Sequence, residues 1–336
     1  MTIIQGGGTV KRDESDRNLM YDKSNLSSYK MVKKDDFIVH LRSFEGGLEK
    51  ASMDGIVSPA YHTFQGENVD SRFYYPYFRS HEFIKKKLIP HVYGIRDGRS
   101  IDIEGMKTIE IPYISLREQQ LIGNYLDCID NLITFHQRKC EQTKKLKKYM
   151  LQKMFPKEGQ TVPEVRFEGF TDAWEKRKLI DEVISIDTGK SKFTQQGSGR
   201  YEILGSTSVI GYDDSYDYQG DFLLTARVGA NAGKLYRYSG KVKISDNTVF
   251  IKGEQLDFLY YALLHFDIKR LSFGTGQPLV KASELKEQEI MMPVEDAERT
   301  IMGEYFSNLD HLITLHQRKC DELQNIKKFM LQNMFI

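Results

Sequence analysis

Apolar residues recur three and four positions apart in two long stretches of the chain, and this spacing predicts two amphipathic helices. The later stretch has one apolar row at Tyr305, Leu309, Leu312, Leu323, Ile326 and Met330. A second row widens its apolar stripe at Phe306, Leu309, Ile313, Cys320 and Leu323. The earlier stretch has the first pattern at Tyr125, Ile129, Leu132, Leu146 and Met150. Each stretch predicts one helix of about 40 residues, or roughly 60 Å.

The two helical stretches are copies of one another. LITFHQRKC at 132–140 returns almost unchanged as LITLHQRKC at 312–320. Over 121–155 and 301–335, 18 of 35 positions are identical without a gap. A helix this long needs a partner along its length, and the obvious partner is the other copy.

A globular α/β (α+β) module precedes each helix. Short strands are expected at 36–41, 221–227 and, at the end of the first module, Ile109–Pro112, while Leu256–Phe266 is expected to be helical. Ser115 is a plausible N-cap for the first long helix. The expected division is a first module at 1–112, a helical spacer at 113–155, a linker at 156–164, a second module at 165–293 and a second helical spacer at 294–336.

The short linker constrains the direction of the second helix. Helices running in parallel would require a return of ~60 Å, which neither the linker nor a module with a radius of gyration of ~14 Å spans comfortably. The sequence therefore predicts an antiparallel coiled coil with one module at each end, a dumbbell with a pseudo-two-fold axis. Such a molecule would present two similar surfaces to two copies of a partner.

Composition adds little that is specific. The chain has 336 residues, is 40% hydrophobic and carries a net charge of +1, so a nucleic-acid surface would have to be local. Cys128, Cys140 and Cys320 are expected to be small buried hydrophobes in a reducing cytoplasm, rather than a disulfide or metal set. No apolar run approaches membrane-spanning length, and no membrane partner is expected.

Familiar catalytic motifs are absent from the sequence. The loop Gly229–Lys234 is one residue too short for a phosphate-binding loop, and Leu235 stands where Ser or Thr is needed. There is no HExxH, CxxC or Asn-Pro-Pro-Tyr motif, so no catalytic or metal residue is expected.

Polar residues shared by the two helix copies have alternative interpretations. His136 and His316 are most simply hydrogen-bonded in the seam between the helices, because neither has an acid or a nucleophile at a useful spacing. Arg138 and Arg318 fit either a solvated face or a contact with a partner. Leu132 and Leu312 are expected in the seam, and the lysines at 144–148 are expected to be solvated or to contact phosphate.

Loops of the modules supply the candidates for DNA contact. Arginine and glutamine read the edges of guanine and adenine, and glycine lets a loop approach a phosphate or groove. Ordinary surface loops remain the alternative for any single residue, and Tyr74, Tyr75, Tyr77 and Phe78 are expected in the core rather than stacked on bases. The candidate residues are Arg42, Arg96, Arg99, Lys190, Lys192, Arg227, Gln277 and Lys281.

Several stretches resemble the specificity subunit of type I restriction-modification enzymes. They are VRFEGFTDAWEKRKL at 165–179, the helix segments ending in HQRK, and KKYMLQKMF and KKFMLQNMF at the ends of the helices. The resemblance covers essentially the whole chain. It implies two target-recognition domains that each read half of a split DNA sequence, with the helices as a ruler between them.

The resemblance also implies which partners to expect. Two modification subunits would bind S-adenosylmethionine, and restriction subunits recruited through them would use ATP and Mg²⁺, while this chain would bind no cofactor and catalyse nothing. The first module has no counterpart of 165–179 and is expected to be truncated at its N-terminus. The rival interpretations are a coiled-coil scaffold that binds only proteins, and an autonomous nuclease or methyltransferase.

Overall fold

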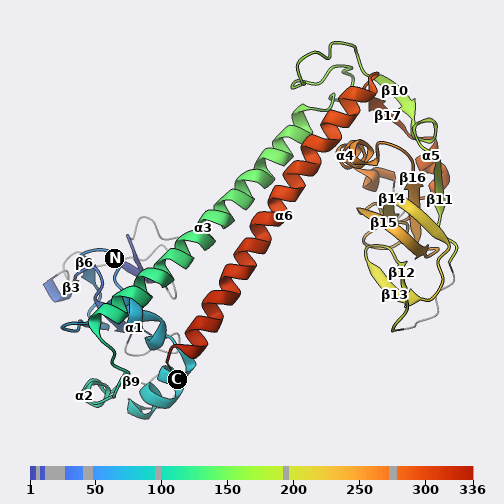
Figure 1. Ribbon diagram of the computed structural model, residues 1–336. Helices are drawn as coiled ribbons and strands as arrows, with labels where there is room; N and C mark the ends of the chain where they lie inside the picture. Colours follow the sequence, from blue (N-terminus) through green and yellow to red (C-terminus); the bar gives the residue numbers. More distant parts are fainter. Residues whose placement is uncertain are drawn as a thin grey trace. The chain divides into compact units, whose positions relative to one another are not determined.

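The computed structural model describes residues 1–4, 8–11, 27–40, 48–94, 100–191, 197–271 and 278–335 (Figure 1). By its internal contacts the chain forms two compact units, one of residues 1–137 with 317–336 and the other of residues 138–316. Both long helices, α3 (Leu116–Lys153) and α6 (Asp296–Asn333), have 38 residues, close to the predicted length. Each unit contains one module and a part of each long helix.

The first unit is built on small antiparallel strand pairs and a three-stranded sheet in the order β5-β4-β7. The side chains of Tyr74, Tyr77 and Phe78 are buried in its main core, as the sequence predicts. Its elements before α3 are β1 (Thr2–Ile4), β2 (Gly8–Val10), β3 (Lys30–Val32), β4 (Phe37–His40), β5 (Glu49–Lys50), β6 (Gly55–Val57), β7 (Tyr61–Phe64), α1 (Ser71–Phe78), a π-helical turn η3 (Glu82–Leu88), η4 (Ile89–His91), β8 (Val92–Tyr93), β9 (Ser100–Ile101) and α2 (Ile103–Lys107).

The start of α3 is capped as predicted, since Ser115 Oγ accepts a hydrogen bond from the Glu118 backbone N–H at 3.3 Å. The strand expected at Ile109–Pro112 is a misprediction, because these residues form neither strand nor helix. In the second unit the equivalent segment is a strand, and it has a partner strand. Ile109 and Ile111 match Ile290 and Met292 as apolar residues at alternate positions, so the difference follows the presence of the partner strand.

The second unit centres on a six-stranded sheet in the order β11-β16-β14-β15-β12-β13, drawn in yellow-green to orange in Figure 1. A separate pair joins β10 to β17. Helix α4 has the bounds that the sequence predicts. The elements are β10 (Glu175–Lys178), η6 (Leu179–Glu182), β11 (Ser185–Thr188), β12 (Tyr201–Leu204), β13 (Val209–Asp213), β14 (Tyr218–Ala226), β15 (Leu235–Ile244), β16 (Thr248–Lys252), α4 (Leu256–Phe266), η7 (Ile268–Leu271), α5 (Ala282–Lys286) and β17 (Glu289–Met292).

Both faces of β14 are covered, which explains its unbroken apolar run. Leu223 belongs to the main core with α4 and α6, whereas Phe222 and Leu224 belong to a second cluster with Val242 and Ile244. Alternate side chains of a strand point to opposite faces, so a strand with two buried faces has no polar alternation.

In each unit the segments of α3 and α6 pack antiparallel. In the first unit Cys320 Sγ lies 3.7 Å from the Ile133 carbonyl oxygen, and in the second unit Cys140 Sγ lies 3.8 Å from the Ile313 carbonyl oxygen. A second contact in each unit, Lys327 with Asp130 and Lys147 with Asp310, shows that the residue number rises along one helix as it falls along the other. The predicted antiparallel pairing of the helices is therefore confirmed.

Candidate nucleic-acid interface

The turn Ser245–Asn247 between β15 and β16 organises several loops of the second module. Its Asn247 carbonyl accepts the Arg227 backbone N–H at 2.9 Å and the Ser206 hydroxyl at 3.2 Å. On its other side, Gly189 N–H donates to the Thr248 carbonyl at 2.9 Å. Loops from four separate strands therefore meet at one turn, and we call this group the turn cluster.

Arg227 lies in the turn cluster at the end of β14. Its backbone is held by the Asn247 carbonyl, and its Nη1 donates to the Asp246 carbonyl at 3.2 Å. These contacts leave its remaining guanidinium N–H groups for a ligand, since no ion pair of Arg227 occurs among the described residues.

Lys190 and Lys281 enter the same cluster from other loops. Lys190 is exposed, and its backbone N–H donates to the Tyr218 hydroxyl at 3.2 Å. Burial raises the pKa of Tyr218, so this phenol stays neutral. Lys281 follows Val280, whose N–H donates to the Arg227 carbonyl at 2.8 Å, and its ammonium pairs with Glu284 at 2.8 Å. The structure thus brings these three predicted residues into one set of connected loops.

The other loop candidates fall outside the described residues. They are Arg42, Arg96, Arg99, Lys192 and Gln277. Lys192 follows Ser191 directly and Gln277 precedes Pro278, and both of those neighbours belong to segments of the turn cluster. The placement of these five candidates stays a prediction.

One cation near the turn cluster was not among the sequence candidates. Lys234 is exposed and closes the loop Gly229–Lys234, whose Gly233 N–H donates to the Ala226 carbonyl at 2.9 Å. The φ of Gly233 is +82°, and an added Cβ would lie 2.9 Å from the Lys269 backbone nitrogen, so only glycine fits there. The sequence signal for this residue is the glycine loop itself, whose spacing excludes a phosphate-binding loop but not an exposed cation.

The seam between the helices follows the second of the two predicted apolar rows rather than the first. Leu126, Ile129, Ile133 and Cys140 are buried on α3, whereas Leu132 and Leu312 are each 42% exposed. The prediction that Leu132 and Leu312 line the seam is therefore corrected. Both rows are apolar, and the row that contains the small cysteines allows the closer approach of the two backbones.

The polar residues of the repeat lie at the edge of this seam or outside it. His136 and His316 are partly buried, and Arg138 and Arg318 are exposed. Cys140 and Cys320 are buried as expected, but Cys128 is exposed, which corrects the expectation for that residue. Arg138 and Arg318 therefore remain available to a partner, as one of the two interpretations requires.

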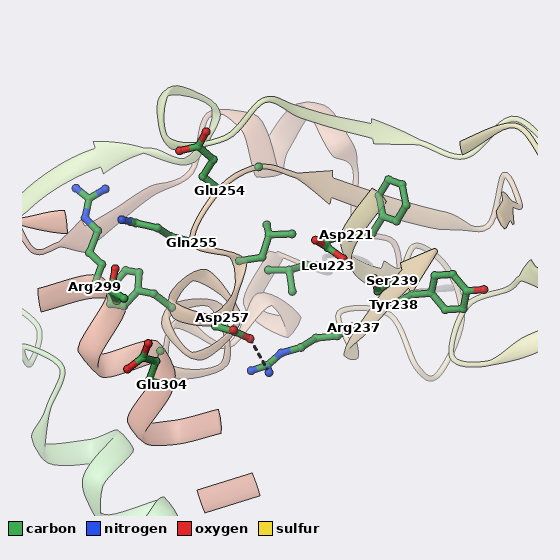
Figure 2. A pocket seen from close by; sticks show the side chains of 16 residues that line it. Asp221, Leu223, Arg237, Tyr238, Ser239, Glu254, Gln255, Asp257, Arg299 and Glu304 are labelled. Atoms are coloured by element: carbon green, nitrogen blue, oxygen red, sulfur yellow. Dashed lines mark ion pairs between the residues drawn. The ribbon is translucent and has the colours of Figure 1, made fainter. Parts of the chain in front are cut away.

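A pocket of about 820 Å³ lies in the second unit beside the start of α6 (Figure 2). Arg237 Nη1 pairs with Asp257 at 2.9 Å, and the guanidinium lies 4.0 Å from the centre of the Tyr260 ring. The carboxylates of Asp221, Glu254 and Glu304 also line the pocket, so its rim is mainly acidic.

The first unit has a pocket of about 550 Å³ at the equivalent place. Asp36, Phe37 and Gln120 line this pocket, while Asp221, Phe222 and Thr300 line the pocket of the second unit. These residues correspond in order when the two modules and the two helix copies are aligned on their repeated sequences. Each unit therefore carries the same type of pocket between a module strand and the start of a long helix.

Among the described residues, no group of three or more His, Cys, Asp or Glu side chains could hold a metal ion. Within the same described part of the chain, no helix has the length and apolar character needed to cross a membrane.

Three comparisons with known proteins agree on one family. Residues 171–325 match the family model described as the type I restriction modification DNA specificity domain. The specificity subunit of the type I restriction enzyme MjaVIII from Methanocaldococcus jannaschii is 27% identical over 277 residues, which cover 71% of this chain and 62% of that relative. The match therefore spans less than two thirds of the relative's length.

The fold agrees with this match. The crystal structure of the S subunit of a type I restriction-modification system from M. genitalium superposes with a TM-score of 0.62 at 16% identity, covering 91% of this chain and 84% of that one. The matched domain includes the whole turn cluster. The chain is therefore similar to specificity subunits of type I restriction-modification systems, and its residues 171–325 match the type I restriction modification DNA specificity domain.

Proposed function

We propose that this chain is the sequence-specific DNA-recognition subunit of a type I restriction-modification complex. The observation that carries the proposal is the turn cluster, which gathers Lys190, Arg227 and Lys281 on connected loops inside the matched specificity domain. Contacts from such cations to phosphate would supply affinity that depends on salt, and contacts to base edges would supply sequence choice.

The duplicated plan supports a split target. Each module would read one half-site, and the paired helices would set the unspecified spacer between the halves. Helices of ~60 Å correspond to about 17 base pairs at ~3.4 Å each, end to end and including both half-sites. The chain itself would contribute recognition and not catalysis.

The two equivalent pockets support a second part of the proposal, in which two modification subunits bind, one at each unit. Restriction subunits would join the complex through them. S-adenosylmethionine, ATP and Mg²⁺ would be bound by those partner subunits, in the cytoplasm. The acidic rim of the pocket in the second unit favours a basic surface on the partner.

The DNA proposal is tested by selecting targets from a randomised DNA duplex library with the chain bound to its modification subunit. Enrichment of a two-part motif with a fixed spacer is the expected result. A complex that assembles but enriches no sequence would favour the rival interpretation, a coiled-coil scaffold that binds only proteins.

The partner proposal is tested by placing a bulky cation in each pocket. Thr300→Arg and Gln120→Arg change exposed, equivalent residues. We expect each variant to bind one modification subunit and the double variant to bind none, as measured by light scattering coupled to chromatography. Binding of two modification subunits by the double variant would show that the pockets are not the docking surfaces.

A further inference from the structure

In the second unit, the segment before β11 covers the face formed by β17 and the start of α6. Strand β10 pairs with β17 over four residues, from Glu175↔Met292 to Lys178↔Glu289. Ahead of β10, Arg166 donates Nε and Nη2 to the two carboxylate oxygens of Glu298, both at 2.7 Å. The Glu298 side chain is 1% exposed and the Arg166 side chain is 11% exposed, so this ion pair is largely enclosed.

Trp174 anchors the same segment. Its ring is 2% exposed and lies 5.7 Å from the ring of Phe155 and 6.2 Å from the ring of Phe258. The segment therefore attaches at three points, which are an arginine, a tryptophan eight residues later and a short strand that follows directly.

The equivalent face of the first unit is not covered by the described residues. Ile109, Ile111 and Pro112 correspond to Ile290, Met292 and Pro293 when the ends of the two modules are aligned. Ile111 is 38% exposed, whereas Met292 is 0% exposed. The backbone N–H of Ile111 donates no hydrogen bond to another described residue, so it is available to pair with an added strand.

The acidic and aromatic anchor points are also present in the first unit. Glu118 corresponds to Glu298, but it is exposed and has no ion pair among the described residues. Phe335 corresponds to Phe155 and lies 5.2 Å from the Phe73 ring, as Phe155 lies 6.1 Å from the Phe258 ring. Phe335 stays partly exposed, and the only tryptophan of the chain is Trp174.

We propose that the face formed by Ile109–Pro112, Glu118 and Phe335, the open face of the first unit, is a docking surface for an extended peptide segment of the kind that residues 165–178 form in the second unit. The second unit defines the chemistry of this segment, which is an arginine for Glu118, an aromatic residue for Phe335 and a strand that pairs with Ile109–Pro112. A second copy of this chain is a poor source, because its own segment is held by the enclosed pair Arg166–Glu298.

A labelled peptide with the sequence of residues 163–180 is the probe, and its fluorescence anisotropy is measured as the full chain is added. We expect saturable binding of one peptide per chain. The peptide with Arg166→Glu should bind at least about tenfold more weakly, because its glutamate would face Glu118.

A charge exchange locates the peptide. The chain variant Glu118→Lys should weaken binding of the original peptide and restore binding of the Arg166→Glu peptide. Glu67→Lys is the matched control, since Glu67 is an exposed glutamate of the same unit outside this face, and it should bind the original peptide as the unchanged chain does. Because Glu118 is exposed, thermal unfolding of both variants should stay close to that of the unchanged chain.

Absence of peptide binding, or binding that ignores the charge at position 118, would overturn the proposal. The experiment uses no DNA and no modification subunit, so its failure would leave the proposed DNA recognition untouched.

Discussion

Lys147 of α3 donates a hydrogen bond to Asp310 of α6 at 2.6 Å, and the duplicated sequence makes the same contact a second time. In the other unit Lys327 of α6 donates to Asp130 of α3 at 2.5 Å. Asp130 and Asp310 occupy the same position in the two helix copies, as do Lys147 and Lys327. Each helix therefore gives the lysine in one unit and the aspartate in the other, which is the pattern expected when two copies of one sequence pack antiparallel.

The two aspartates should differ in their contribution to stability. Asp310 also accepts the Tyr261 hydroxyl at 2.7 Å, whereas Asp130 is bound only by Lys327 among the described residues. We expect Asp310→Asn to lower the free energy of unfolding by about 1–2 kcal/mol. The equivalent change Asp130→Asn should cost less than about 1 kcal/mol.

Urea unfolding followed by circular dichroism measures both aspartate variants, and each serves as the control for the other. Equal losses from the two would contradict the role assigned to Tyr261.

Among the ion pairs of the second unit, loss of the pair Arg166–Glu298 should lower the free energy of unfolding most. Glu298→Gln leaves the buried Arg166 without its counter-ion and should lower the free energy of unfolding by about 3 kcal/mol or more. Fluorescence of Trp174 follows the unfolding of this unit, because Trp174 is the only tryptophan. The equivalent change Glu118→Gln, on the surface, should stay within about 0.5 kcal/mol. A similarly small effect of Glu298→Gln would show that the ion pair contributes little to the free energy of unfolding.

Stability of the second unit should fall in mild acid because of His265. Burial lowers the pKa of His265, whose ring stacks on Phe155 at 4.9 Å. The unfolded chain then binds a proton at a higher pH than the folded chain does. Stability is therefore fully present above the ordinary histidine pKa of ~6.5 and is lost as the pH falls below it.

The pH dependence is measured by urea unfolding of the second unit at several pH values, again through Trp174. The variant His265→Gln should give a flatter profile between pH 7 and pH 5 than the unchanged chain. Identical slopes of stability against pH for the variant and the unchanged chain would show that His265 does not cause the loss of stability in mild acid.

Lys190 should contribute to DNA affinity mainly through phosphate. Lys190→Ala should weaken binding to all sequences alike and reduce the slope of log affinity against log salt by about 1. Lys176→Ala removes an exposed lysine from β10, outside the turn cluster, and should leave the slope unchanged. Filter binding over a range of salt concentrations distinguishes the two variants. Equal salt slopes for Lys190→Ala and Lys176→Ala would show that Lys190 does not contact the DNA.

Base choice should depend on Gln277, one of the candidate loop residues predicted from the sequence. Gln277→Ala should relax selection at one base position, at a cost of about 1–3 kcal/mol against the preferred target, while Lys281→Ala should weaken all sequences alike. Competition binding with single-base variants of the target measures both. Unchanged profiles for both variants would show that this loop is not the reader.

The sequence predicted the repeated helices, their antiparallel pairing and the core role of Tyr74 and Tyr77, because periodicity and length govern those features. It could not choose between two apolar rows on one helix, so Leu132 was placed in a seam that Ile133 and Cys140 form. Nor could it show that Ile109–Pro112 has no partner strand among the residues that the structure describes, because pairing depends on residues far away in the chain. The turn cluster was predicted only as scattered loop residues, since hydrogen bonds to Asn247 between distant loops leave no local pattern.

The most direct test of the account is methylome sequencing of a host that lacks other modification systems and expresses this chain with its modification subunit. The account predicts methyladenine in both halves of one split motif, with a fixed spacer between the halves. A stable complex that leaves the genome without methyladenine at any defined sequence, or that methylates an undivided motif, would contradict the assignment of two DNA-reading modules held apart by the helices.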